Sequence, residues 1–138
     1  MKKSAAPLGD RFRFHGHCQR HVMVEMFRTC RAVVVPTTTD FVEGFNQVVA
    51  ESILAGRPVV TSDVCPAIKY VGDAAVVVPP DDVSAYAQAI ARLANDAGFY
   101  QHCVDACGTA REQFFDENRG WAAALEKAVH LAVPEYAT

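Results

Sequence analysis

Two glutamates separated by seven residues, Glu43 and Glu51, are the side chains best placed to do chemistry in this chain. Gly44 lets the backbone beside them come close to a ligand. The next residues begin a helix, and their amides point out of its start: Phe45, Asn46, Gln47 and Val48. Unpaired amides and the helix dipole make such a start a site for phosphate. Glu51, roughly a turn and a half into the helix, can accept hydrogen bonds from paired ribose hydroxyls.

Three short runs rich in β-branched residues must form the sheet that positions these glutamates. They are Ala32–Val35, Pro58–Thr61 and Ala75–Val78. Each run is continuously apolar, which predicts parallel strands covered on both faces. A fourth segment, Arg11–His15, alternates and predicts a strand near the edge of the sheet. The glutamates follow the first run, and ligands of open α/β sheets bind at the carboxyl ends of strands.

Helical patterns lie between and after the strands. They cover Gln19–Thr29, about Asn46–Ala55, a segment from Val83 to Leu93 that Asp81 or Asp82 can cap, and segments around Tyr100–Cys107 and Trp121–Val129. The alternation predicts an α/β fold with a doubly wound parallel sheet. Trp121 and the pair Phe114 and Phe115 are expected to be packing residues.

Composition narrows the class of protein. The chain has 138 residues, of which 51% are apolar, so it can bury the core of one domain. Its net charge of −3 and scattered basic residues argue against nucleic acid as a partner. No signal peptide or membrane-spanning run is expected. Five cysteines without a CxxC pair indicate free, mostly buried thiols in a reducing compartment, and so a cytoplasmic protein.

Five motifs in the same order resemble those of retaining glycosyltransferase family 4, the "glycosyl transferases group 1", which have the two-domain GT-B fold. Glu43 and Glu51 match the Glu-x7-Glu pattern of that family. The other matches are Phe14–Gly16 with "F-x-G", Ala32–Thr37 with "advfvlPS", Glu43–Asn46 with "EGFG", Gly56–Ser62 with "G-x-P-V-V-a-S", and Val76–Asp82 with "lv-p-p-d". The similarity covers roughly residues 12–130.

The resemblance implies a role for each matched residue. Glu51 binds the ribose hydroxyls, the amides from Phe45 to Val48 hold the diphosphate, and Glu43 is the catalytic residue that contacts the transferred sugar. Asn46 stands where the family usually has glycine, which narrows the backbone angles allowed there. His17 lies in a loop that the family places near the nucleotide base.

The resemblance also implies an activity. Family members are hexosyltransferases that retain anomeric configuration and need no metal. They take a UDP-, GDP- or ADP-sugar as substrate and transfer its sugar to a glycan or lipid-linked acceptor, often in polysaccharide biosynthesis. For this chain it predicts no cofactor, and a peripheral place at the inner face of the membrane in the full-length enzyme.

The matched segment is only part of the GT-B architecture. The amino-terminal acceptor domain is missing, as are two strands, a glycine-rich turn and an Arg/Lys pair. We therefore expect a disordered tail over residues 1–10, and over 11–138 the truncated second half of a GT-B C-terminal domain. This domain would be a Rossmann-like parallel sheet with flanking helices, and it is not expected to be active alone. To cover the open sheet edge, either Arg11–His15 pairs beside Val33–Val35 or two copies of the chain join there.

Two other interpretations compete with a transferase part. The cluster of His15, His17, Cys18 and His21 suggests a metal site, because His17 and His21 could share a helix face. No second group with metal-ligand spacing follows, so no metal is expected. The second is a stand-alone nucleotide-binding or protein-association module without catalysis.

Overall fold

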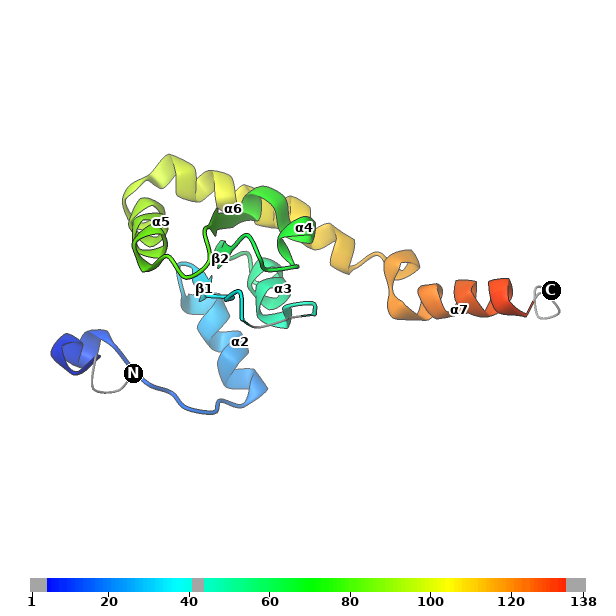
Figure 1. The fold of residues 1–138 in the computed structure, drawn as a ribbon, viewed down its shortest axis with the longest axis horizontal. Coiled ribbons are helices and arrows are strands. Elements are labelled where there is room, and N and C mark those ends of the chain that lie inside the picture. The colour runs from blue at the N-terminus through cyan, green and yellow to red at the C-terminus, as the bar shows by residue number, and fades with distance from the viewer. Residues whose placement is uncertain (1–4, 41–43, 134–138) are drawn as a thin grey trace.

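A three-stranded parallel sheet lies at the centre of the fold (Figure 1). The computed structural model describes residues 5–40 and 44–133. The strands are β1 (Val33–Val35), β2 (Val59–Ser62) and β3 (Ala75–Val78), in the order β1-β2-β3. Val59 lies opposite Val33 on one side and Ala75 on the other. The three apolar runs thus form parallel strands as predicted.

Six α-helices and four 3-10 turns surround the sheet in the described part of the chain. The helices are α2 (Arg20–Thr29), α3 (Gln47–Leu54), α4 (Ile68–Val71), α5 (Val83–Asn95), α6 (Ala97–Arg111) and α7 (Trp121–Ala132). The 3-10 turns are η1 (Ala6–Arg11), η2 (Gly72–Ala74), η3 (Glu112–Phe114) and η4 (Glu117–Arg119). Asp82 caps α5, where its carboxylate accepts from the Ala85 N–H at 2.9 Å. The predicted alternation of strands and helices is confirmed.

The core consists of two apolar clusters on opposite faces of the sheet, because successive strand residues point to opposite sides. Val59 packs with Val49 and Ile53 of α3 in one cluster, and Val60 packs with Ala89 and Leu93 of α5 in the other. Helix α6 contributes to both, through Cys107 in the first cluster and Cys103 in the second. All five cysteines are free, and Cys65, Cys103 and Cys107 are buried, as predicted.

The predicted strand over Arg11–His15 is wrong. The segment runs beneath the sheet as an extended coil (Figure 1). Phe12 and Phe14 are exposed, and their rings contact each other with centroids 4.8 Å apart. An alternating segment becomes a strand only where a neighbour supplies its hydrogen bonds, and in the described sheet β1 pairs with β2 and not with this segment.

Strand β1 is therefore an edge strand within the described structure. It pairs with β2 on one side, and Val34 is 43% exposed. The proposed pairing of Arg11–His15 beside β1 is not made. The other expectation, that two copies of the chain join at this edge, stays a prediction.

Helix α7 extends away from the sheet like an arm (Figure 1). Trp121, Leu125 and Val129 follow one another at intervals of four residues and are all exposed, Trp121 to 81%. Trp121 and the 66% exposed Phe115 are thus not the packing residues we predicted, whereas Phe114 does pack against the core. The stripe on α7 meets no apolar surface among the residues described. None of the described helices is long and apolar enough to cross a membrane.

Candidate functional site

Buried hydroxyl groups fix the chain where it leaves β1, toward the predicted site. Thr61 donates from Oγ1 to the Val35 carbonyl at 2.8 Å, and Ser62 donates from Oγ to the Thr37 carbonyl at 2.6 Å. Both donors lie on β2 and are fully buried. A buried hydroxyl without an acceptor is costly, so these bonds hold the segment after β1 firmly against β2.

The same segment is also tied to the chain after β3. The Tyr86 hydroxyl lies 3.5 Å from the Val35 carbonyl, and burial raises the pKa of Tyr86, so the hydroxyl remains a donor. Thr39 donates from Oγ1 to Asp81 Oδ2 at 3.3 Å. Asp81 has a positive φ of 60°, a conformation that Asp adopts more readily than most residues. The loop that leads to the site is held from two sides.

The start of α3 has the geometry of a capped helix. The Asn46 side chain is buried, and its Oδ1 accepts from the Val49 N–H at 3.2 Å. Asn46 has φ −77° and ψ 103°, an ordinary extended conformation, so asparagine is accommodated there without strain. The next two amides, of Gln47 and Val48, lie in the first turn, where the helix offers no acceptor. Both residues are exposed.

Glu51 is half-buried and lines a cavity of about 220 Å³ between α2 and α3. The other lining residues are Arg20, Val24, Phe27, Arg28, Leu54 and Ala55. Gln47 and Glu51 are four residues apart, which places them on one face of α3. The cavity therefore combines a carboxylate with two arginines, about one turn away from the first-turn residues Gln47 and Val48.

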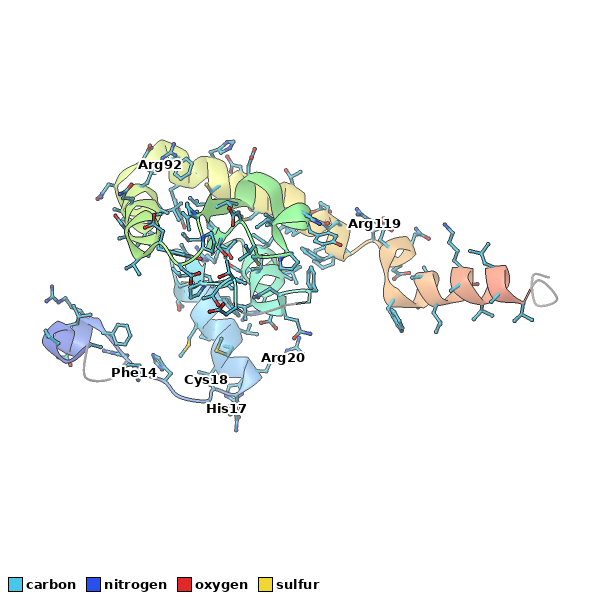
Figure 2. The ribbon with its side chains drawn as sticks, in the orientation of Figure 1. Phe14, His17, Cys18, Arg20, Arg92 and Arg119 are labelled. Atoms are coloured by element: carbon cyan, nitrogen blue, oxygen red, sulfur yellow. The ribbon has the colours of Figure 1, made fainter. Side chains whose placement is uncertain are left out.

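His17 does not line the Glu51 cavity. Figure 2 shows His17, Cys18 and Arg20 together at the N-terminal end of α2, with His17 pointing away from the sheet. His17 is exposed, and of these three residues only Arg20 lines the Glu51 cavity. Over residues 5–40 and 44–133, no group of three metal-ligating side chains is placed to hold a metal. Glu43, the predicted catalytic residue, lies outside the described residues.

An aromatic contact beside the helix start was not anticipated from the sequence. The Phe45 ring meets the Tyr70 ring of α4 at 5.6 Å and the Phe114 ring of η3 at 6.3 Å, both edge to face. The sequence suggested a role for the Phe45 amide and a packing role for Phe114, but no local pattern connects three segments so far apart in the chain.

A larger hollow of about 650 Å³ lies between α4, η2 and α6. Its lining carries both signs of charge, with Lys69 and Arg119 beside Asp73 and Asp105. His102 lies 3.7 Å from Asp73 at the surface. Neither Glu51 nor the start of α3 lines this hollow, so its size does not make it the site that the sequence predicts.

The family described as "Glycosyl transferases group 1" matches residues 1–96, more than half of the chain. The chain is 27% identical over 141 residues to D-inositol 3-phosphate glycosyltransferase of Streptomyces bingchenggensis (strain BCW-1), covering 99% of this chain and 28% of that protein. It is 32% identical over 107 residues to O-antigen chain mannosyltransferase B of Escherichia coli, and this match covers 77% of this chain and 27% of that protein.

A solved structure resembles the fold. Sucrose-phosphate synthase from Thermosynechococcus elongatus, a GT-B glycosyltransferase, matches with a TM-score of 0.75 and 24% identity, over 99% of this chain and 33% of that one. The chain thus spans about a third or less of the proteins it matches. The chain belongs to the glycosyl transferases group 1 family.

Proposed function

We propose that this chain forms the donor-binding part of a retaining glycosyltransferase. The diphosphate of a UDP-, GDP- or ADP-sugar binds at the start of α3, and the ribose hydroxyls bind to Glu51. One observation carries the proposal: Glu51 lines a cavity about one turn from the first-turn residues Gln47 and Val48, in a chain of a glycosyltransferase family. A carboxylate and helix-start amides at this spacing complement a ribose followed by phosphates.

The chemistry of transfer follows from charge. As the bond between sugar and diphosphate breaks, negative charge develops on the leaving diphosphate. The first-turn amides and the positive end of the α3 dipole stabilise that charge without needing to reorganise. Arg20 and Arg28 add positive potential beside the same cavity. Glu43 contacts the transferred sugar. The acceptor, a glycan or a lipid-linked sugar, is held by a separate domain, so this chain does not transfer sugar alone.

Calorimetric titration with UDP, GDP and ADP tests the proposal. We expect one of them to bind, and Glu51→Ala to weaken that binding by about 1–3 kcal/mol, since a charged hydrogen bond is lost. The loss must depend on ribose: with the 2′,3′-dideoxy form of the same nucleotide, Glu51→Ala and the unchanged chain should bind alike.

A matched control variant distinguishes a specific effect of the Glu51 carboxylate on affinity from the general effect of removing one negative charge. Glu25 lies on α2, exposed, and forms a surface ion pair with Arg28 at 3.9 Å. Glu25→Ala removes the same charge near the same arginine and should leave nucleotide affinity unchanged. If none of the three nucleotides binds, or if Glu51→Ala binds as tightly as the unchanged chain, the proposed site is wrong.

A protein-association module without catalysis is the second candidate function. The open edge of β1 and the exposed apolar stripe of α7 favour it, because both are surfaces that other chains could cover. Sedimentation analysis distinguishes the two functions. A stable dimer that binds no nucleotide supports the association role, and pairing of two copies at β1 would be its simplest form.

A further inference from the structure

We propose that Phe114 is a positioning residue of the donor site. Together with Tyr70 it holds the ring of Phe45, and in this way it fixes the backbone that begins α3. The inference rests on the proposed nucleotide site and adds to it a residue from η3, the turn that follows α6.

The contacts around Phe45 are those of an anchor. Its ring is 48% exposed, yet it meets Tyr70 at 5.6 Å with an interplanar angle of 74° and Phe114 at 6.3 Å with an angle of 62°. Edge-to-face rings at these separations attract each other beyond simple burial. Phe45 directly precedes Asn46, the residue that caps α3. The anchored ring therefore sits next to the amides proposed to bind the diphosphate.

The two rings that receive Phe45 are themselves held in place. Phe114 packs against the core cluster of α3 and α6. Gln113 donates from Nε2 to the Tyr70 carbonyl and also to the Ala110 carbonyl, the latter at 2.7 Å. The first bond joins η3 to α4 and the second joins η3 to α6, so Tyr70 and Phe114 form one support rather than two independent contacts.

Apart from the buried side chain of Asn46, the segment that they anchor has little other side-chain packing. Gly44 has no side chain, and a Cβ placed there would meet nothing within 4 Å. The neighbouring Gln47 and Val48 are exposed. Amides that bind an anion best are already in position before the ligand arrives, because ordering a loose segment on binding costs affinity. The Phe45 anchor supplies that order.

The test compares Phe114→Leu with Phe115→Leu in the whole chain. Phe115 is the adjacent residue, 66% exposed, and makes none of the ring contacts described. We expect Phe114→Leu to speed amide hydrogen exchange over residues 44–48 by about three- to tenfold and to raise the Kd for the nucleotide bound by the unchanged chain by a similar factor. Phe115→Leu should change neither quantity.

Further variants keep the proposal falsifiable. If Phe114→Leu does not fold, Tyr70→Leu carries the same test, because the Tyr70 ring is half exposed. Phe45→Leu keeps the amide and removes the ring. It should weaken binding to the same degree, and the double variant with Phe114→Leu should be little weaker than either single one.

The possible results distinguish a failure of the proposed Phe45 anchor from a failure of the proposed nucleotide site. Unchanged exchange over residues 44–48 in Phe114→Leu overturns the anchor. Faster exchange with an unchanged Kd overturns the positioning role. If the unchanged chain binds no nucleotide, the proposed function fails instead, and the exchange rates alone still decide whether the anchor exists.

Discussion

Arg57 links the turn after α3 to the carboxyl end of α2. Its Nε donates to the Phe27 carbonyl at 3.2 Å, and its Nη2 lies 2.5 Å from the Arg28 carbonyl. Carbonyls in the last turn of a helix have no amide partner within the helix, and the negative end of the helix dipole attracts a cation. Arg57 therefore donates to two of these end carbonyls, of which that of Phe27 also accepts from the Cys30 thiol, and it complements the dipole of α2 at the same time.

The size of this contribution follows from where the two bonds lie. The Nε bond is partly buried, and a hydrogen bond from a charged donor contributes about 1.5 kcal/mol at the lower end of its range. The Nη2 bond is at the surface, where solvent reduces a charged contact to about 0.5 kcal/mol. We expect Arg57→Ala to lower the free energy of unfolding by about 2 kcal/mol. Arg57→Lys keeps the positive charge but lacks the planar guanidinium group that donates both bonds. It should therefore lower the free energy of unfolding by about half as much as Arg57→Ala.

Urea unfolding followed by circular dichroism measures the effect. With a slope of about 2 kcal/mol per molar urea, Arg57→Ala should move the midpoint down by about 1 M. Arg13→Ala, at an exposed position before α2, is the matched control and should not move it. If Arg57→Ala unfolds within about 0.2 M of the unchanged chain, the α2 end is not held in the way described. A lysine variant as stable as the unchanged chain would refute the two-carbonyl geometry, because it would show that the positive charge alone is sufficient.

Two further predictions concern α6. Asp96 caps this helix by accepting from the Phe99 N–H at 2.9 Å, so Asp96→Ala should cost about 1 kcal/mol in urea unfolding and Asp96→Ser much less; equal losses would argue against the cap. Burial, and after it the neighbouring Cys103, raises the pKa of the Cys107 thiol to about 11. Since the unfolded chain ionises this thiol first, stability should fall as the pH rises from about 8.5 to 11, by at most about 3 kcal/mol. Urea midpoints measured over this range should fall less steeply for Cys107→Ala, and parallel profiles would contradict the assignment.

The strands and helices were predictable because their signals are local. A run such as Val33–Val35 is too apolar for any place except a strand covered on both faces, and the structure has it within one residue of the prediction. The alternation in Arg11–His15 is equally local, but a strand also needs a neighbour. Sequence cannot show that the neighbour is absent. Trp121 was misjudged for the same reason, since an apolar residue on a helix packs only where a surface faces it.

The candidate site was likewise predictable only in those parts whose signals are local in the sequence. The helix start and Glu51 follow from one continuous stretch, and the structure places Glu51 about one turn after the capped start of α3, in a cavity that continues to Leu54 and Ala55. Arg20, which lines that cavity, comes from α2 and was not singled out. The contacts of Phe45 with Tyr70 and Phe114 depend on how three distant segments fold together, so no spacing in the sequence indicates them.

Helix α6 contributes to both core clusters, although it lies outside the residues that match the family. The part of the chain that folds together is therefore longer than the part that matches. The family match ends at residue 96, just before α6 begins at Ala97. Yet Cys107 of α6 packs in the first core cluster, and Cys103 of the same helix packs in the second. A nascent chain synthesised only as far as Asp96 already has α3 and α5 on the two faces of its sheet but lacks what α6 adds to each cluster, so it gains its full cooperative stability only after α6 has emerged.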